Sequence, residues 1–179
     1  MITEQFIAKV EEIVGASHVT KTGADLELYS YDASLVSGRP GLVVFPGTTE
    51  EVSEVLREAG QAGVHSVARG FATNLSGGSI ISDGGLVVCL SRFNKILGIY
   101  PESRYAVVQT GVTNLELQEA LAPLGAFYAP DPASQKVSTI GGNVGENSGG
   151  PRCLKYGVTS NHILGMRTVM ADGEIVQIG

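Results

Sequence analysis

Two glycine-rich segments hold the residues best suited to chemistry in this chain. The first is RGFATNLSGG at residues 69–78, directly after a predicted strand, and the second is TIGGNVGENSGG at residues 139–150. In the first segment, successive backbone N–H groups can form a concavity that binds an anion, while threonine, asparagine and serine side chains add donors and an arginine adds positive charge. This chemistry suits a pyrophosphate. A long surface loop without a ligand is the alternative on the local sequence alone.

The second segment contains paired glycines, which allow backbone amides to approach a flat, polar ligand closely. It follows PDPAS at residues 130–134 and precedes KYG at residues 155–157. The edge of a flavin ring, with its nitrogen and oxygen acceptors, needs partners of this kind. Because glycine pairs also occur where strands cross tightly, this segment alone does not decide between a ligand site and a packing role.

Motifs and composition argue against several other kinds of site. The chain lacks the G-x-G-x-x-G turn of dinucleotide-binding folds, the G-x-x-x-x-G-K-[ST] phosphate loop and the G-x-S-x-G motif of hydrolases. Its three histidines lie far apart, and Cys89 and Cys153 make neither a disulfide framework nor a metal knot, so we expect no metal. A net charge of −6 argues against nucleic acid as a partner.

The elements that must position these segments begin with an α/β lobe. Apolar stripes with capping residues predict helices over residues 4–14 and 48–63. Short apolar runs predict strands over residues 42–45, 65–68 and 86–90. A strand, a helix and a strand in succession form a right-handed crossover, so these strands are predicted to be parallel.

The second half of the chain has an antiparallel pattern. It predicts a strand over residues 106–110 and a helix over residues 113–125 that begins with a capping box. Strands over residues 163–170 and 175–178 are joined by Asp172-Gly173, which is typical of a two-residue hairpin. The expected fold class is therefore α+β, with a small parallel α/β lobe followed by an α+β lobe that has antiparallel strands.

The two glycine-rich segments, in this order and about 70 residues apart, resemble the FAD-binding domain of the vanillyl-alcohol oxidase (PCMH) type. Within that group the chain is similar to the flavin subunit of bacterial glycolate oxidase and to D-lactate dehydrogenases. The stretches that carry the resemblance are 68–78, 130–150, 154–159 and 163–173. The implied organisation is an N-terminal helical segment, 1–37, and a two-lobed FAD-binding domain, 38–179, whose lobes meet near residues 98–99 and which holds an extended FAD between them.

The resemblance also implies the residues that contact the cofactor. Those expected around the pyrophosphate are Arg69, Gly70, Phe71, Ala72, Thr73 and Asn74, with Gly77 as a further cofactor-binding residue. Those expected along the ribityl chain and the isoalloxazine are Pro130, Asp131, Ser134, Thr139, Gly142, Asn143, Gly149, Tyr156 and Gly157, with Ile175 near the adenine. Within the second segment, Gly142 and Asn143 are expected to face the ligand while Ile140 and Val144 pack beneath it.

Two departures from the family pattern affect these expectations. Relatives usually have glycine at the position of Ala72, where a positive φ would cost an alanine about 1–2 kcal/mol. Some relatives attach their flavin covalently through histidine or cysteine, but neither segment contains histidine and Cys153 is the one thiol nearby. We therefore expect FAD to bind non-covalently.

The implied activity is flavin-dependent oxidation of a small 2-hydroxy acid, glycolate or D-lactate. The resemblance covers a C-terminally truncated domain without the cap that holds substrate, so the catalytic residues stay unknown and this fragment alone is expected to be inactive. Implied partners are other oxidase subunits and a second copy through the strand edge at 175–178. The expected location is cytoplasmic, with membrane association through partner subunits. The alternatives are a non-catalytic subunit that serves assembly and a flavin reductase acting on UDP-linked sugars.

Overall fold

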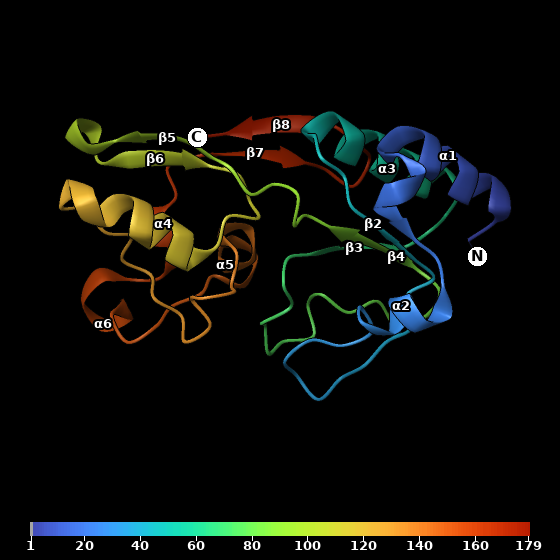
Figure 1. Cartoon of the computed structure of the whole chain (residues 1–179), viewed down its shortest axis with the longest axis horizontal. Coiled ribbons are helices and arrows are strands. Elements are labelled where there is room, and N and C mark those ends of the chain that lie inside the picture. The colour runs from blue at the N-terminus through green and yellow to red at the C-terminus, as the bar shows by residue number, and fades with distance from the viewer. Residues whose placement is uncertain (1) are drawn as a thin grey trace. The chain divides into compact units, whose positions relative to one another are not determined.

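The computed structural model describes residues 2–179, which divide into two compact units. The first unit contains the chain up to Arg92 together with Gly165–Gly179, and the second contains Phe93–Leu164. Figure 1 shows the elements of both units along the chain. The α+β class predicted from the sequence is confirmed, because each unit combines helices with strands and both parallel and antiparallel pairs occur.

A four-stranded sheet forms the centre of the first unit. Its strands, in spatial order, are β1 (Val19–Thr20), β2 (Leu42–Val44), β4 (Leu86–Cys89) and β3 (Ser66–Arg69). The pairs of β4 with β2 and with β3 are parallel, as predicted, whereas β1 pairs with β2 in the antiparallel direction. Every residue of β2 and β4 is buried, which explains why both strands read as unbroken apolar runs.

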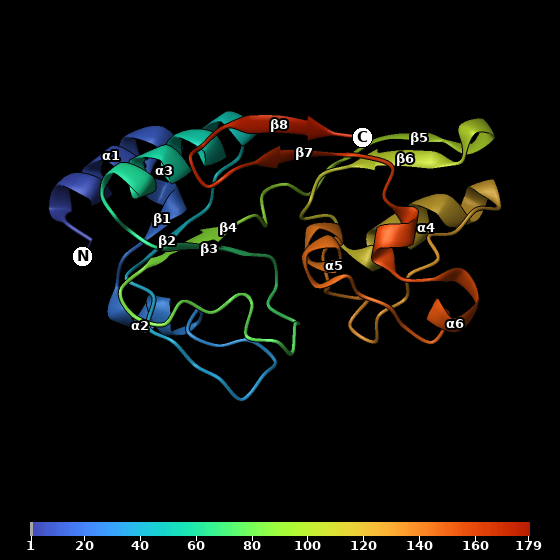
Figure 2. The same ribbon diagram turned by 180° about the vertical axis from the view of Figure 1, so that it is seen from behind.

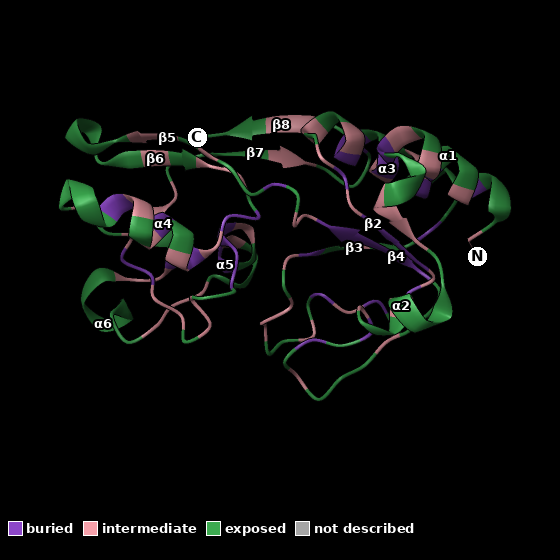
Figure 3. Cartoon of the chain, in the orientation of Figure 1, coloured by how far each residue is buried: buried purple, intermediate pink, exposed green. Residues whose placement is uncertain are grey.

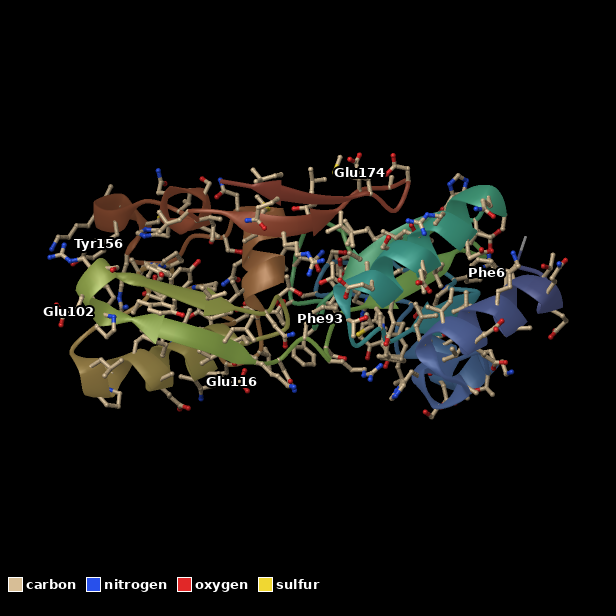
Figure 4. The ribbon with its side chains drawn as sticks, turned by 90° about the horizontal axis from the view of Figure 1, so that it is seen from above. Phe6, Phe93, Glu102, Glu116, Tyr156 and Glu174 are labelled. Carbon is tan, nitrogen blue, oxygen red and sulfur yellow. The ribbon has the colours of Figure 1, made fainter. Side chains whose placement is uncertain are left out.

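Helices α1 (Glu4–Val14) and α3 (Thr49–Gln61) cover one face of this sheet (Figure 1). Phe6 and Val10 of α1 and Val55 of α3 pack with the sheet in one buried cluster. Figure 4 labels Phe6 where α1 meets this core. The N-terminal segment therefore belongs to the core of the first unit and is no separate appendage, which differs from the boundary expected at residue 37.

Helix starts are fixed by side chains that the sequence identifies correctly. The Oγ1 atom of Thr3 accepts a hydrogen bond from the N–H of Phe6 at 3.2 Å, and the Oγ1 atom of Thr48 accepts one from Glu51 at 3.1 Å. Each hydroxyl satisfies a backbone donor that has no partner within its helix. The apolar stripes that follow these caps predict the ends of α1 and α3 to within about two residues.

The opposite face of the sheet is covered by less regular structure. Helix α2 (Gly23–Glu27) and the segments that follow β1 and β3 lie on this side, and Val43, Ile81, Val87 and Cys89 form its buried cluster. In Figure 3, β2 and β4 are coloured as buried, whereas α2 is mostly exposed. Two long loops lie on this face: residues 28–38, which follow α2, and residues 70–79, which follow β3 (Figure 1).

The C-terminal hairpin packs on the first unit, which corrects its expected place in the second lobe. Strands β7 (Met166–Val169) and β8 (Ile175–Ile178) are antiparallel. The hydroxyl of Ser53 in α3 donates to the carbonyl of Gly173, and Arg167 lies 2.8 Å from Glu50. The turn has three residues and not two, because Met170 and Glu174 still pair and Gly173 takes a left-handed φ of +84°.

The second unit packs helix α4 (Asn114–Leu121) against a two-stranded ribbon (Figure 2). The ribbon consists of β5 (Ile96–Tyr100) and β6 (Tyr105–Val108), of which only β6 is predicted; Gly98 and a register shift interrupt the β5 pattern. Its core is Val112, Leu117, Leu121 and Ile140. The remaining helices are α5 (Ile140–Glu146), α6 (Cys153–Tyr156) and the 3-10 turns Ala16–His18, Pro101–Ser103, Ala122–Leu124 and Thr159–His162.

Candidate functional site

Residues 70–79, here called the 70–79 loop, directly follow Arg69, the last residue of the edge strand β3. None of the residues 2–179 accepts a hydrogen bond from the backbone N–H groups of residues 70–74. Ala72 and Gly77 have left-handed backbone, with φ of +54° and +75°. A run of unpaired N–H groups around a left-handed residue can bind anionic oxygen atoms, so the loop fits a diphosphate.

The side chain of Arg69 does not add its charge to the loop, which corrects the expected role. Arg69 is 7% exposed, and its Nη2 donates to the carbonyl of Tyr31 at 2.8 Å. Its guanidinium also lies 5.5 Å from the ring centroid of Tyr29. Because residues of a strand alternate between faces, this side chain projects into the first unit and holds the 28–38 segment.

Asn74 is also used internally. Its Nδ2 donates to Asp32 at 2.6 Å, and its Oδ1 accepts from the hydroxyl of Ser79 at 2.9 Å. Both ends of this amide are therefore occupied by protein. Sequence reasoning missed Asp32, which lies in a mixed segment without periodicity; its only local signal is the Asp-x-Ser spacing that lets its carboxylate accept from the N–H of Ser34 at 2.7 Å.

The other side chains of the loop are more accessible. Phe71 is 51% exposed, while Thr73 is partly buried and makes no hydrogen bond among the described residues. Side-chain donors for a ligand thus reduce to the hydroxyl of Thr73, with the backbone supplying the rest. The backbone N–H groups are therefore the main hydrogen-bond donors that this loop leaves open.

Replacing Ala72 with glycine is expected to raise the free energy of unfolding by about 1 kcal/mol, because glycine removes the cost of a left-handed alanine. For a chain of this size that corresponds to roughly 3 °C in Tm, measured by differential scanning fluorimetry. Ala133→Gly is the control, because Ala133 has no positive φ and its substitution should only lower stability. An Ala72→Gly variant less stable than its parent would contradict the backbone conformation assigned here.

Residues 140–146 of the second glycine-rich segment form helix α5 and not the expected loop, while residues 147–150 are irregular. Thr139 caps α5, and its Oγ1 accepts from the N–H of Gly142 at 3.1 Å. A Cβ at Gly141 would lie 2.7 Å from Cβ of Thr110. Some of these glycines are therefore required by close packing inside the second unit, which is the alternative that the sequence left open.

The predicted orientation of the residues of α5 is correct for some of them and wrong for Asn143. Ile140 is buried and Gly142 is exposed, as expected, but Asn143 is only 1% exposed. Residues three apart share one face of a helix, so Asn143 follows Ile140 into the core. Its Nδ2 has no partner among the described residues, and the same holds for Oδ1 of Asn114. Asn143 is thus a buried polar residue and does not line an open ligand surface.

The PDPAS turn is held by contacts within the second unit. The carbonyl of Pro130 accepts from Nδ2 of Asn114 at 3.0 Å, and the carbonyl of Ser134 accepts from the N–H groups that close the turn. Asp131 accepts from the N–H of Arg152 at 3.1 Å and lies 3.2 Å from its Nε. These contacts connect the turn to the end of the glycine-rich segment.

Tyr156 lies at the surface of the second unit (Figure 4), with its ring 5.6 Å from that of Phe127. These rings, together with Gln118 and Arg152, line a shallow hollow of about 270 Å³. Gly157 has a φ of +86°, and a Cβ there would lie 2.5 Å from Oδ1 of Asn161, so only glycine fits. The hollow brings together Tyr156 and the arginine that binds the PDPAS turn.

The predicted cofactor residues therefore fall into two sets. Those of the first unit are Arg69–Asn74, Gly77 and Ile175, which is half-buried on β8. Those of the second unit are Pro130, Asp131, Ser134, Thr139, Gly142, Asn143, Gly149, Tyr156 and Gly157. A Cβ at Gly149 would lie 3.3 Å from Cβ of Cys153, which makes this glycine a packing position as well.

A mixed sheet whose parallel edge strand opens into a donor-rich loop, followed by a smaller α+β unit, is typical of a domain that binds a diphosphate-containing cofactor. The chain belongs to the family described as "FAD binding domain", whose model matches residues 40–179.

Solved structures show the same fold. An alkyldihydroxyacetonephosphate synthase is 23% identical with a TM-score of 0.89, covering 100% of this chain and 38% of that one. The 4-ethylphenol oxidase from Gulosibacter chungangensis is 28% identical with a TM-score of 0.82 over 98% of this chain and 35% of that one. A p-cresol methylhydroxylase is 20% identical with a TM-score of 0.82 over 98% of this chain and 36% of that one. The predicted PCMH-type fold is confirmed.

Curated relatives include two proteins named for hydroxy acids. "Glycolate oxidase subunit GlcD" of Bacillus subtilis is 41% identical over 180 residues, covering 100% of this chain and 38% of the relative. "D-lactate dehydrogenase" of Anaerostipes hadrus is 34% identical over 99% of this chain and 38% of the relative. The chain thus spans about two-fifths of the length of these relatives.

Residues 2–179 include no helix that combines the length and apolar character needed to cross a bilayer. The same residues bring together no group of three or more histidine, cysteine, aspartate or glutamate side chains able to hold a metal ion.

Proposed function

We propose that this chain is the FAD-binding part of a flavin-dependent oxidoreductase that acts on a small 2-hydroxy acid, glycolate or D-lactate. The observation that carries the proposal is the row of unpaired N–H groups in the 70–79 loop at the end of β3. The names of the relatives support the substrate class, since glycolate and D-lactate are both 2-hydroxy acids.

FAD, when bound, supplies redox chemistry that no side chain of this chain can supply. The chain's own residues bind and orient it. We infer that the backbone of Gly70–Asn74 and the hydroxyl of Thr73 hold the diphosphate, that the second unit contributes Gly142 and Tyr156 toward the ring, and that Ile175 lies near the adenine. Attachment is proposed to be non-covalent, because neither glycine-rich segment contains histidine.

Partners are proposed from the same relatives. The word "subunit" in the name of the Bacillus subtilis relative supports assembly with other oxidase subunits, which would also account for any association with a membrane. β8 belongs to a sheet of two strands in the described chain, so a second copy could pair with its free edge. Oligomeric state is checked by light scattering.

Titration with FAD tests the proposal directly. The purified chain is expected to quench flavin fluorescence and to show a shifted flavin absorption band, with the flavin released on denaturation because it is not covalently attached. Substituting Gly70 with leucine should abolish binding, since the backbone must approach the phosphate oxygens closely.

The matched control is Gly60→Leu, because Gly60 is exposed on α3 and a Cβ there meets nothing within 4 Å. If Gly70→Leu bound FAD as tightly as its parent, the loop assignment would be wrong. If the parent itself bound no FAD, the non-catalytic assembly subunit would become the better description.

A further inference from the structure

We propose that Asp32 is a positioning residue, which fixes the 70–79 loop for FAD by holding the side chain of Asn74. The inference rests on the proposed function and extends it to a residue outside the range matched by the family model, 40–179. Asp32 is proposed to act on the cofactor only through Asn74 and the 70–79 loop.

The carboxylate of Asp32 is placed between two backbone segments. It is 7% exposed, its Oδ1 accepts from the N–H of Ser34 at 2.7 Å, and its Oδ2 accepts from Nδ2 of Asn74 at 2.6 Å. The far side of the same amide accepts from the hydroxyl of Ser79 at 2.9 Å. One carboxylate thus anchors an amide that connects the middle of the loop to its end.

The charge of this carboxylate fixes the direction of the amide. An ionised carboxylate only accepts hydrogen bonds, so Asn74 must turn its nitrogen toward Asp32 and its oxygen toward Ser79. Burial raises the pKa of Asp32. Hydrogen bonds from Ser34 and Asn74, together with the charge of Arg69, lower it by more than burial raises it, so the pKa of Asp32 lies below its ordinary value. Asp32 is therefore ionised at neutral pH.

The charged and titratable groups around Asp32 and its arginine come from three elements. They are Tyr29 and Tyr31 of the 28–38 loop, Arg69 of β3 and Cys89 of β4. Only the guanidinium of Arg69 is positive among them, and it binds the carbonyl of Tyr31 next to Asp32. The loop is thus tied on one side through Arg69 and on the other through Asn74.

Electrostatics and geometry predict opposite effects of Asp32 on the cofactor. By Coulomb's law, a negative charge beside an anion-binding loop weakens binding of a diphosphate. Holding the loop in one conformation strengthens binding, because no ordering cost is left for the cofactor to overcome. Two short hydrogen bonds to a buried carboxylate favour the geometric effect, so loss of Asp32 should weaken FAD binding in spite of the charge removed.

A double-mutant cycle on FAD affinity tests this mechanism, with titration followed by flavin fluorescence. Asp32→Ala and Asn74→Ala are each expected to weaken affinity about tenfold, the effect of one or two lost hydrogen bonds. Because Asp32 acts through Asn74, the double variant should bind about as well as Asn74→Ala alone. Asp83→Ala is the matched control, since Asp83 is exposed and makes no hydrogen bond or ion pair through its side chain among residues 2–179, and it should leave affinity unchanged.

Conservative variants keep the test valid if Asp32→Ala unfolds. Asp32→Asn can still accept from Ser34 while the amide of Asn74 rotates to accept from it, so affinity should return to within about threefold of the parent. Asp32→Ser keeps the contact with Ser34 but is too short to reach Asn74, and it should behave as Asp32→Ala in the same cycle.

Two results would overturn the inference while leaving the proposed function intact. One is additive losses in the cycle, which would mean that Asp32 stabilises the fold without acting through Asn74. The other is tighter FAD binding by Asp32→Asn, which would mean that its charge outweighs its geometry. A parent chain that binds no FAD would remove the proposed function, and this inference with it.

Discussion

Arg69→Met is expected to lower the free energy of unfolding by about 3 kcal/mol and to abolish FAD binding. The guanidinium is 7% exposed and donates to the carbonyl of Tyr31 at 2.8 Å, with the carbonyls of Leu28, Tyr29 and Ser79 at 3.5 Å. Methionine fills a similar volume but leaves the carbonyls of Tyr31 and Ser79 without this donor and removes the positive charge near Asp32. Urea denaturation followed by circular dichroism measures the loss.

The control for this prediction is Arg39→Met, which removes the same charge from an exposed side chain in the same unit. Its stability should stay within about 0.5 kcal/mol of the parent, the usual range for surface substitutions. Arg69→Lys should recover little, because an ammonium group cannot reach several carbonyls with the geometry of a guanidinium. An Arg69→Met variant as stable as Arg39→Met would show that these carbonyls do not depend on Arg69.

The regular elements are predictable because their signals are local. A capping hydroxyl followed by an apolar stripe defines α1, α3 and α4, and the unbroken apolar runs of β2 and β4 indicate strands buried on both faces. The full capping box of Thr113 and Glu116 appears as the spacing predicts. In each of these cases the local preference and the tertiary environment agree.

The predictions from sequence are wrong where a contact between residues far apart in the chain determines the local structure. The C-terminal hairpin is grouped with the wrong lobe because its partner, Ser53, lies 120 residues earlier in the chain. Helix α5 is taken for a loop because its glycines weaken the helix signal, although Gly141 is needed for contact with Thr110. No local pattern distinguishes a glycine that admits a neighbouring side chain from one that admits a ligand.

The candidate site shows the same limit. The sequence identifies the 70–79 loop correctly as a glycine-rich segment with polar side chains that directly follows a strand. It does not show that the side chains of Arg69 and Asn74 are used by the protein itself, since their partners lie in the irregular 28–38 segment. The backbone of the loop is left as the main source of ligand donors.

Gly150→Ala is expected to destabilise the second unit by about 3 kcal/mol, because the added Cβ has no space. It would lie 2.3 Å from the backbone oxygen of Asp131 and 2.5 Å from its carbonyl carbon. Backbone atoms cannot move aside as a flexible side chain can, so the turn at Asp131 must shift. That shift would break the hydrogen bond and the ion pair that Asp131 makes with Arg152.

The control is Gly145→Ala, which makes the same chemical change five residues earlier. Nothing lies within 4 Å of a Cβ at Gly145, and this residue is inside helix α5. Alanine is favoured over glycine in a helix by roughly 0.5–1 kcal/mol, so this variant should be more stable than the parent. Opposite signs for the two substitutions, measured by urea denaturation, would establish Gly150 as a packing glycine that holds the PDPAS turn. Equal stabilities would mean that Asp131 does not lie against Gly150, and the second set of cofactor residues would then lose the contact that positions its turn.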